Sequence, residues 1–253
     1  MDKPFHVSIN DGIADLVLDQ PPVNALNSKG WLALADEIKI LGENSQVKVI
    51  VISAMGKGFC AGVDIKELAA DPGAIVAVNR GNYQTFEAIH RNPKPIISAL
   101  HGFVLGGGIG ISGASDIIVA SECCRFGVPE IDRGAMGGGA HLQRMFPVQT
   151  VRYMYFTGEF IDAEEAYRLG AIYKVVKKEA LQETARVIAQ KIASKSPAMV
   201  RLAKEALTGI EDGDLEDKYR WEQGFTYEAY SMNDSQEARD AFVEKRNPTF
   251  NDK

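Results

Sequence analysis

The sequence predicts an α/β fold, in which buried strands alternate with helices, followed by a helical C-terminal region. Short β-branched, apolar runs occur at residues 47–53, 96–100 and 117–120. Such runs are typical of strands that are covered on both faces. The segments between them leave room for helices, and helical periodicity dominates from about residue 148. Strands separated by helices imply parallel pairing with crossovers, which defines a layered α/β fold.

The N-terminal segment predicts a β-hairpin. Residues 7–9 and 13–18 are apolar stretches on either side of Asn10-Asp11-Gly12, a typical turn sequence. Pro21-Pro22 then breaks the pattern. We therefore expect two antiparallel strands before the first helix.

The first helix is predicted over residues 29–41, because Asn27-Ser28 offers an N-cap. Its apolar residues recur on one face. They are Trp31, Leu34, Ala35 and Ile38. This face is expected to lie on the strands.

The second half of the chain is predicted to be mainly helical. The periodic segments are residues 163–169, 178–194, 197–208, 215–231 and 235–245. Ser196-Pro197 is typical of a helix start with proline in the first turn. The segment after Ser196 is too small to form a good core alone. It is expected to pack on the first layer, on a neighbouring subunit, or on both.

Composition excludes several classes of protein. The 253 residues carry 28 Lys and Arg against 34 Asp and Glu, a net charge of −6, and the pI is near 5.4. This charge argues against nucleic acid or an anionic membrane as the main partner. No apolar run approaches the roughly 20 residues of a membrane span. The first residues show no apolar signal-peptide core, and three cysteines, two of them adjacent, argue against a disulfide framework. A cytoplasmic protein is expected.

A glycine-rich segment, residues 105–110, follows the strand-like run 96–100. Three consecutive glycines let a ligand approach the backbone amides. If a helix begins there, its first N–H groups point outward and suit a negative charge developing on oxygen. The alternative is a tight turn packed against another strand. Residues 108–113 also match G-x-G-x-x-G, but the next strand-like run begins too soon for a dinucleotide-binding crossover helix.

A second loop of small residues, 58–67, also runs from a strand into an expected helix. Two such loops supply two N–H donors, which is what an oxyanion hole requires if they converge on one oxygen.

Several segments occur in the order and spacing of the enoyl-CoA hydratase/isomerase (crotonase) superfamily, which the chain resembles over essentially its whole length. They are Ala-Gly-Val-Asp-Ile-Lys-Glu (61–67), His-Gly-Phe-Val-Leu-Gly-Gly-Gly (101–108), Ser-Asp-Ile-Ile-Val-Ala (115–120), Phe-Gly-Val-Pro-Glu (126–130), Asn-Ala-Leu (24–26) and Ala-Phe-Val-Glu-Lys-Arg (241–246). The resemblance implies a spiral of ββα turns, here residues 1–195, and a C-terminal helical trimerisation region, here residues 196–253. It also implies a homotrimer or a dimer of trimers.

The resemblance further implies an acyl-CoA thioester as substrate, with coenzyme A as part of that substrate and with neither a permanently bound cofactor nor a metal. The thioester oxygen would be held by the amides of Ala61 and Gly107. Matching positions place CoA-binding residues at Asn24, Ala25, Leu26, Asp64 and Ile65, and at Phe242 and Lys245, which often reach a neighbouring subunit's CoA.

One catalytic position departs from the hydratase pattern. Hydratases of this superfamily use two glutamates around one water, but the chain has Gly110 at one position and Glu130 at the other. Loss of one proton-handling group typically costs about 10²–10⁴ in rate. Simple hydration is therefore disfavoured, and chemistry with one base remains open: isomerisation, proton abstraction, or activation of water against a ketone.

A smaller subgroup shares further local sequence. Residues 129–137 and 219–226 are similar to the ring-opening crotonase homologues of bacterial steroid catabolism, which hydrolyse a carbon–carbon bond of a bicyclic β-diketone CoA thioester. The resemblance implies that Glu130 helps water to add to a ring ketone. It also implies that Arg133 holds a ketone or the new carboxylate, although an ion pair with a neighbouring acid explains Arg133 equally well.

Other interpretations remain open from the sequence. An isomerase or a residual hydratase would use Glu130 alone, and a non-catalytic acyl-CoA-binding subunit would use no base. His141 is expected to serve packing or hydrogen bonding, and Glu222 fits an amphipathic helix without chemistry. Cys60 is expected to be a small buried group instead of a nucleophile.

Overall fold

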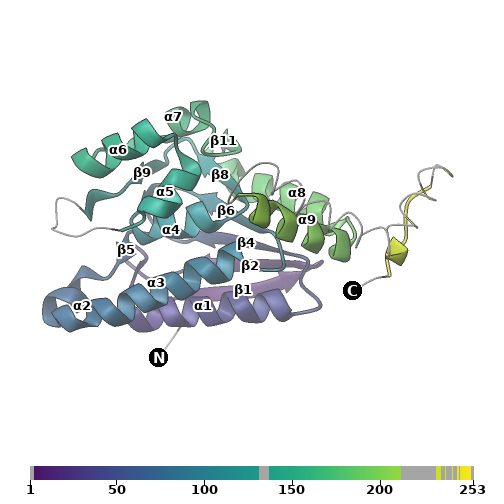
Figure 1. Ribbon diagram of the computed structural model, residues 1–253, viewed down its shortest axis with the longest axis horizontal. Coiled ribbons are helices and arrows are strands. Elements are labelled where there is room, and N and C mark those ends of the chain that lie inside the picture. The colour runs from purple at the N-terminus through teal and green to yellow at the C-terminus, as the bar shows by residue number, and fades with distance from the viewer. Residues whose placement is uncertain are drawn as a thin grey trace.

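The structure is a computed structural model that describes residues 3–130 and 137–211, together with residues 232–234, 237, 241, 244 and 246–251. A central sheet runs through the molecule and carries helices on both faces (Figure 1). Within the described part of the chain, no helix is long and apolar enough to cross a membrane.

The predicted hairpin forms the edge of this sheet. β1 (Phe5–Asn10) pairs antiparallel with β2 (Ile13–Leu18). Asp11 and Gly12 connect them with φ values of +54° and +78°. Positive φ at both residues is the backbone of a tight hairpin turn, and Asp-Gly is a preferred sequence for it.

The remaining strands of the large sheet are parallel. Its order is β1-β2-β4-β6-β8-β11, with β4, β6, β8 and β11 as the added strands. Their bounds are Val49–Ala54, Ile96–Leu100, Ile117–Ser121 and Lys174–Val176. Every residue of β4 and β6 is buried, which explains their continuous apolar sequences. The predicted parallel α/β architecture is confirmed.

Helices cover both faces of the sheet. Helix α8 (Leu181–Ala193) places Ala185 and Ala189 in a cluster with Ile13 and Val49. On the other face, helix α1 (Ser28–Glu43) buries Trp31, Leu34 and Ile38. The cap of α1 is the predicted one, since Asn27 Oδ1 accepts a hydrogen bond from Gly30 N at 2.8 Å.

Short strands form two smaller sheets beside the large one. One contains β7 (Phe103–Leu105), β9 (Arg125–Gly127) and β10 (Ile161–Asp162), and the other pairs β3 (Ala25–Leu26) with β5 (Gly62–Val63). A strand of the large sheet, a strand of a smaller sheet and a helix follow one another repeatedly along the chain. This repetition is the ββα spiral that the family resemblance implies.

The remaining helices include the two predicted over residues 163–169 and 197–208. They are α2 (Ile65–Ala70), α3 (Ile75–His90), α4 (Gly107–Ala114), α5 (Gly139–Met145), α6 (Val148–Thr157), α7 (Ala163–Arg168) and α9 (Pro197–Ile210), and short 3₁₀ turns occupy Pro72–Ala74 and Lys178–Ala180. The helix predicted over 178–194 therefore begins with a 3₁₀ turn. The helices predicted over 215–231 and 235–245 lie outside the described residues, apart from isolated positions.

Candidate active site

The two loops of small residues lie in contact. A side chain on Gly62 would come within 3.0 Å of the amide nitrogen of Gly107, and one on Gly107 within 3.2 Å of the Cα of Gly62. Both distances are shorter than most Cβ contacts, so a side chain at either position would push the two loops apart by a few tenths of an ångström. The loops therefore converge where β5 passes the start of α4.

The amide of Gly107 is available at this point. Gly107 is the first residue of α4, and the first helical hydrogen bond runs from Gly110 N to Gly106 O at 3.1 Å. The N–H groups of the first helical turn have no acceptor within the helix, and the positive end of the helix dipole lies there. This position favours a negatively charged oxygen.

The amide of Ala61, the second expected donor, already forms a hydrogen bond within the protein. Its N–H donates to Val23 O at 3.1 Å, and the N–H of Asp64 donates to Leu26 O at 2.9 Å. Leu26 is paired with Val63 in the parallel register and accepts from Asp64 N, so the adjacent N–H of Val63 points away from β3. Gly62, with a φ of +89°, interrupts the regular strand between Ala61 and Val63. The other edge faces β7, since Leu105 N donates to Cys60 O at 2.9 Å. The expectation for Ala61 is therefore corrected, and Val63 is the candidate for the second donor.

Glu130 reaches the same point through the pairing of β7 with β9. These strands are parallel, so the segments that follow them leave from one edge of the small sheet. Gly106 N donates to Gly127 O at 3.2 Å and fixes that edge. A side chain on Gly106 would collide with Oε1 of Glu130, so the carboxylate lies against the residue before Gly107. Gly106 also has a φ of +49°, which favours glycine.

Phe86 occupies the position at which a second carboxylate would lie. A side chain on Gly110 would collide with the ring of Phe86. That ring packs edge-on against Trp31 at 5.8 Å and against His141 at 4.7 Å between centroids. The aromatic cluster therefore occupies the space that a glutamate side chain at residue 110 would need.

The residues expected to bind CoA are brought together by the β3–β5 pairing. The side chain of Asn24 is used structurally, because its Nδ2 donates to Met55 O and Gly58 O at 2.9 and 3.0 Å. Leu26 is buried, whereas Ile65 is exposed. Asp64 caps α2 by accepting from Lys66 N at 2.9 Å. If Asn24 contacts a ligand, we therefore expect its backbone and not its side chain to make the contact.

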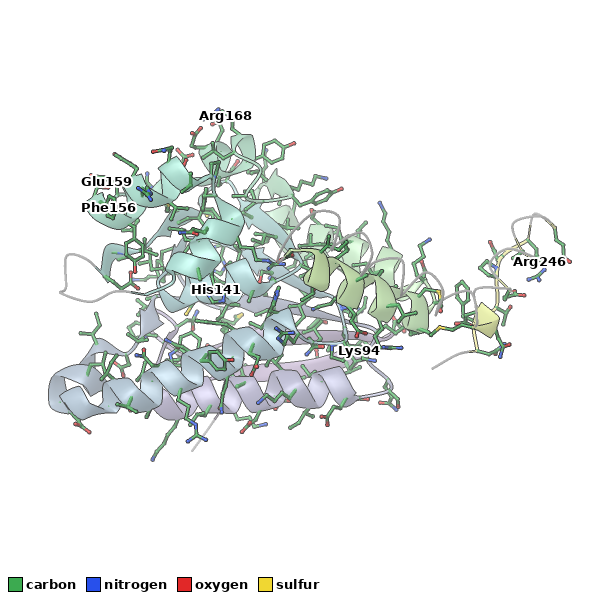
Figure 2. The ribbon with its side chains drawn as sticks, in the orientation of Figure 1. Lys94, His141, Phe156, Glu159, Arg168 and Arg246 are labelled. Carbon is green, nitrogen blue, oxygen red and sulfur yellow. The ribbon has the colours of Figure 1, made fainter. Side chains whose placement is uncertain are left out.

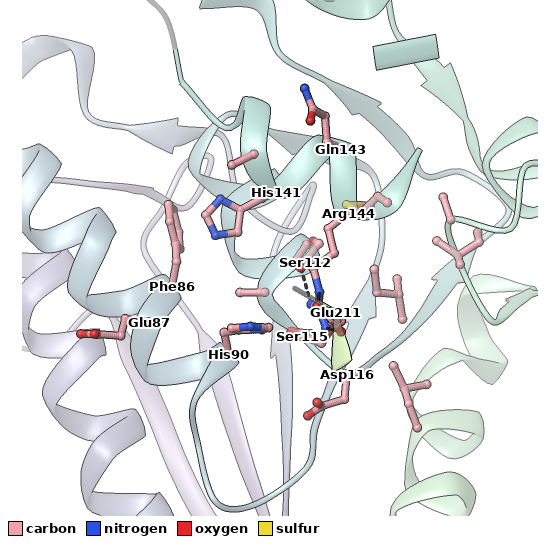
Figure 3. Close-up of a pocket in the computed structure, with 18 of the residues that line it drawn as sticks. Phe86, Glu87, His90, Ser112, Ser115, Asp116, His141, Gln143, Arg144 and Glu211 are labelled. Atoms are coloured by element: carbon pink, nitrogen blue, oxygen red, sulfur yellow. Dashed lines mark hydrogen bonds and ion pairs between the residues drawn. The ribbon is translucent and has the colours of Figure 1, made fainter. Parts of the chain in front are cut away.

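The remaining predicted residues separate into two groups. Arg133, Glu222, Phe242 and Lys245 lie outside the described residues. His141 is described: it lies on α5 and points toward Phe86 (Figure 3). Burial lowers the pKa of His141, and the nearby Arg144 and His90 lower it further. A neutral, packed imidazole agrees with the structural role expected for it.

A cavity of about 1100 Å³ is lined in part by Phe86. Its other lining residues come mainly from α3, α4 and α5, among them His90, Ser112 and Arg144, and Glu211 after α9 also lines it (Figure 3). Arg144 forms a two-pronged ion pair with Glu211, with both N···O distances at 2.7 Å. Neither Glu130 nor Gly107 lines this cavity. The cavity is therefore distinct from the point at which amides and carboxylate meet.

Cys60 is part of the scaffold. Its Sγ donates to Asn24 O at 3.1 Å, and burial raises its pKa to about 12. A thiol with that pKa carries little thiolate near neutral pH, which makes it a poor nucleophile. Among residues 3–130, 137–211 and the isolated described positions, no group of three or more His, Cys, Asp or Glu side chains is arranged to hold a metal ion.

Two loops of backbone amides in contact, with the carboxylate of Glu130 beside them among the described residues, are typical of enzymes that stabilise an oxyanion while a base moves protons. The sequence profile of the enoyl-CoA hydratase/isomerase family matches residues 8–253, and the chain belongs to that family. The expected family is therefore confirmed, and the protein is an enzyme of the acyl-CoA class.

Two curated relatives share an unusual substrate. Both are named (7aS)-7a-methyl-1,5-dioxo-2,3,5,6,7,7a-hexahydro-1H-indene-carboxyl-CoA hydrolase. The Rhodococcus jostii protein is 45% identical over 240 residues, covering 94% of this chain and 93% of the relative. The Mycobacterium tuberculosis protein is 43% identical over 236 residues, covering 92% and 96%. These names agree with the ring-opening subgroup that the sequence resembles.

Solved structures confirm the fold. An enoyl-CoA hydratase of Mycobacterium smegmatis superposes with a TM-score of 0.94 at 29% identity, over 98% of this chain and 99% of that one. Human enoyl Coenzyme A hydratase domain-containing protein 3 also gives 0.94, at 32% identity, over 98% and 100%.

Sequence reasoning missed Val63 and the aromatic cluster. Trp31 was identified only as a member of the apolar face of its helix, and Phe86 was not singled out. The N–H direction of Val63 follows from its pairing with Leu26, and the sequence does not give that pairing partner.

Proposed function

We propose that this enzyme hydrolyses a carbon–carbon bond in the ring system of a bicyclic diketone CoA thioester. The observation that carries the proposal is the carboxylate of Glu130 beside Gly106 and Gly107, combined with Phe86 in place of a second carboxylate. A site with one base favours addition of water to a ketone over hydration of a double bond, which uses two proton-handling groups in this family. The two relatives at 43–45% identity, named as hydrolases of such a compound, support the same reaction.

In the proposed mechanism, the amides of Val63 and Gly107 hold the thioester oxygen. Glu130 takes a proton from water as the water oxygen bonds to the ring ketone carbon, which gives a tetrahedral alkoxide. Collapse of the alkoxide breaks the adjacent carbon–carbon bond, and the electron pair moves into an enolate conjugated with a carbonyl. The proton held by Glu130 then returns to carbon. The fixed N–H dipoles stabilise enolate charge on the thioester oxygen more than they stabilise the neutral thioester.

Several further assignments belong to the same proposal. Arg133 binds the ketone or the new carboxylate, and Phe242 and Lys245 bind CoA. The chain needs no resident cofactor, because water is the co-substrate. We place the catalytic spiral in residues 1–195, and the helical oligomerisation region in residues 196–253. The Ser196 Oγ cap on Met199 N at 3.4 Å supports a helix start at that boundary.

We also propose a homotrimer or a dimer of trimers in the cytoplasm. Exposed apolar side chains along and just after α6 support an interface there: Val148, Tyr153, Phe156 and Phe160, called here the α6 patch. Phe156 is 70% exposed and points outward from the end of α6 (Figure 2). Apolar side chains gathered in this way mark protein-contact surfaces. Free cysteines among the described residues fit a reducing compartment.

The test is incubation of the purified enzyme with a bicyclic diketone CoA thioester in H₂¹⁸O, followed by mass spectrometry. We expect a product heavier than the substrate by one water, with the label in a new carboxylate. Glu130→Gln removes the base and is expected to lower kcat by about 10²–10⁴.

Glu122→Gln is the matched control, because Glu122 is an exposed carboxylate only eight positions away in the printed sequence. It is expected to keep wild-type turnover. An unlabelled product of unchanged mass would point to isomerisation, hydration of crotonyl-CoA would point to a hydratase, and tight binding with no reaction would point to a non-catalytic subunit.

A further inference from the structure

Polar atoms of two side chains next to this site are buried without a hydrogen bond. They are Nε1 of Trp31 and Oδ1 of Asn82, and neither has a partner among the residues that the structure describes. Trp31 is fully buried. Buried polar atoms in folded proteins are nearly always paired, and an exception at a site of chemistry points to a role there. Neither residue takes part in the mechanism above.

The indole of Trp31 lies against the start of α4. A side chain on Gly107 would come within 2.5 Å of Cζ2 of Trp31. Cζ2 is bonded to the ring-junction carbon that also carries Nε1, so the edge of the indole with the N–H group adjoins Gly107. The residue that offers an amide to the thioester oxygen is therefore in contact with the indole edge that carries the unpaired donor.

Asn82, on α3, lies level with the start of α4. Helices α3 and α4 run in the same direction, because Phe86 packs on Gly110 and, one turn further, His90 lines the same cavity as Ser115 (Figure 3). Asn82 precedes Phe86 by four residues and thus lies one turn earlier on the same face of α3. That turn is level with the start of α4.

Helix α3 also holds Trp31 directly. Thr85 Oγ1 donates to Trp31 O at 2.9 Å, and a side chain on Gly81 would come within 2.7 Å of the Cβ of Trp31. Gly81 and Thr85 directly precede Asn82 and Phe86 in the sequence of α3. The turn of α3 that carries Asn82 is thereby fixed against Trp31 by packed helices instead of by loops.

We infer that Trp31 and Asn82 bind an oxygen atom of the acyl group and thereby select substrates that carry a ring ketone. This inference rests on the proposed function, because it assigns a specificity for the same site. A ketone oxygen accepts from the indole N–H. Its hydrated form also has an O–H that the Oδ1 of Asn82 accepts, and rotation of the amide offers an NH₂ group to the ketone itself. Phe86 supplies the apolar wall beside them.

The inference explains why the site would reject simple fatty acyl groups. A site with buried polar groups disfavours a ligand that leaves those groups unpaired, and this effect discriminates more strongly than the fit of an apolar pocket. A saturated acyl chain would leave both atoms unpaired, whereas a ring ketone next to the thioester would not.

The test measures binding in the Glu130→Gln background, in which turnover is expected to be about 10²–10⁴ slower. The probes are two CoA thioesters with the same bicyclic skeleton, one with the ring ketone and one with a methylene group in its place. We expect Trp31→Phe and Asn82→Leu each to weaken binding of the ketone thioester about 3- to 10-fold, the effect of one lost hydrogen bond, and to change binding of the methylene analogue less than 2-fold.

Asn79→Leu is the matched control, because Asn79 is exposed on the same helix. It should leave both affinities unchanged. The chain has two tryptophans, so Trp31→Phe also assigns the indole ¹⁵N–¹H signal of Trp31. The ketone thioester should shift that signal downfield and the methylene analogue should not. This signal and Asn82→Leu still test the inference if Trp31→Phe does not fold.

The two proposals fail in different ways. The inference would be overturned if Glu130→Gln bound both thioesters with equal affinity, or if the indole signal did not respond to the ketone thioester. Either result would do so even if the wild-type enzyme opens the ring. Preference for the ketone thioester, lost in Trp31→Phe and Asn82→Leu, would support the inference even if the wild-type enzyme leaves the ring intact and the proposed reaction is wrong.

Discussion

At the scale of single residues, the chemistry of the site depends on a glycine and a phenylalanine. Hydration in this family uses a second glutamate at the position of Gly110. Here the ring of Phe86 fills that space and is held by Trp31 and His141 on either side. A change at one of these residues alone therefore cannot restore a two-carboxylate site.

This packing predicts a coupled pair of substitutions. Gly110→Glu alone should lower the free energy of unfolding by about 1–3 kcal/mol, because its Cβ would overlap the ring of Phe86. Phe86→Ala/Gly110→Glu should recover part of that loss and should gain measurable hydration of crotonyl-CoA. Urea unfolding and an absorbance assay measure the two effects.

Phe86→Ala alone is the control, since it opens the space without adding a carboxylate. It should remain inactive as a hydratase. Equal stability of Gly110→Glu and the wild type would contradict the packing argument.

At the scale of elements, the pairing of short strands positions the catalytic groups. β7 and β9 end at one edge and deliver Gly107 and Glu130, while β5 passes beside β7 and delivers Val63. None of these strands is longer than three residues. Their geometry is therefore supported by the large sheet and by the helices packed on it.

A buried lysine fastens α9 to this framework. The Nζ of Lys204 donates to Ile89 O, Lys94 O and Asp116 Oδ2 at 3.2, 3.0 and 2.8 Å. Burial lowers the pKa of Lys204, and the charge of Asp116 opposes that shift. The three acceptors lie at the end of α3, before β6 and before β8, so one ammonium group joins several elements.

Lys204→Met is expected to lower the free energy of unfolding by about 3–5 kcal/mol, because it leaves the carboxylate of Asp116 and two carbonyls without their cation. Urea denaturation followed by circular dichroism measures the change. Lys191→Met is the control, since Lys191 is exposed on α8. A loss no larger than that of the control would show that Lys204 contributes no net stability.

At the scale of the whole molecule, the two faces of the central sheet are already covered within one chain. Helix α8 covers one face and α1 the other (Figure 1). The proposed assembly would therefore use helix surfaces for its subunit contacts, and the exposed α6 patch is such a surface.

Light scattering should therefore give a mass about three or six times the 27.6 kDa of the chain. Phe156→Asp places a charge in the α6 patch and should shift the mass toward that of the monomer. Ile40→Asp alters an exposed side chain on α1 and should leave the mass unchanged. A monomeric wild type would contradict the proposed assembly, and an unchanged Phe156→Asp mass would place the interface elsewhere.

Much of the fold could be predicted because its signals are local. The apolar runs of β4, β6 and β8, the Asp-Gly turn and the Asn27 cap depend on neighbours within a few residues. The order of short motifs likewise identified the family. The prediction of one catalytic carboxylate was also local. It came from Glu130 at the end of residues 126–130 and from Gly110, two positions after the three consecutive glycines.

The sequence by itself therefore determined most of the described elements and the family, and it predicted Glu130 as the base. Only the tertiary structure decided that the N–H of Ala61 is bonded to Val23 O. It also decided that Phe86 fills the space beside Gly110 and that the indole of Trp31 lies against Gly107. The physical reason is that the direction of an amide or a side chain repeats every two residues in a strand and every 3.6 in a helix. Its absolute phase is set by packing partners that lie far away in the sequence.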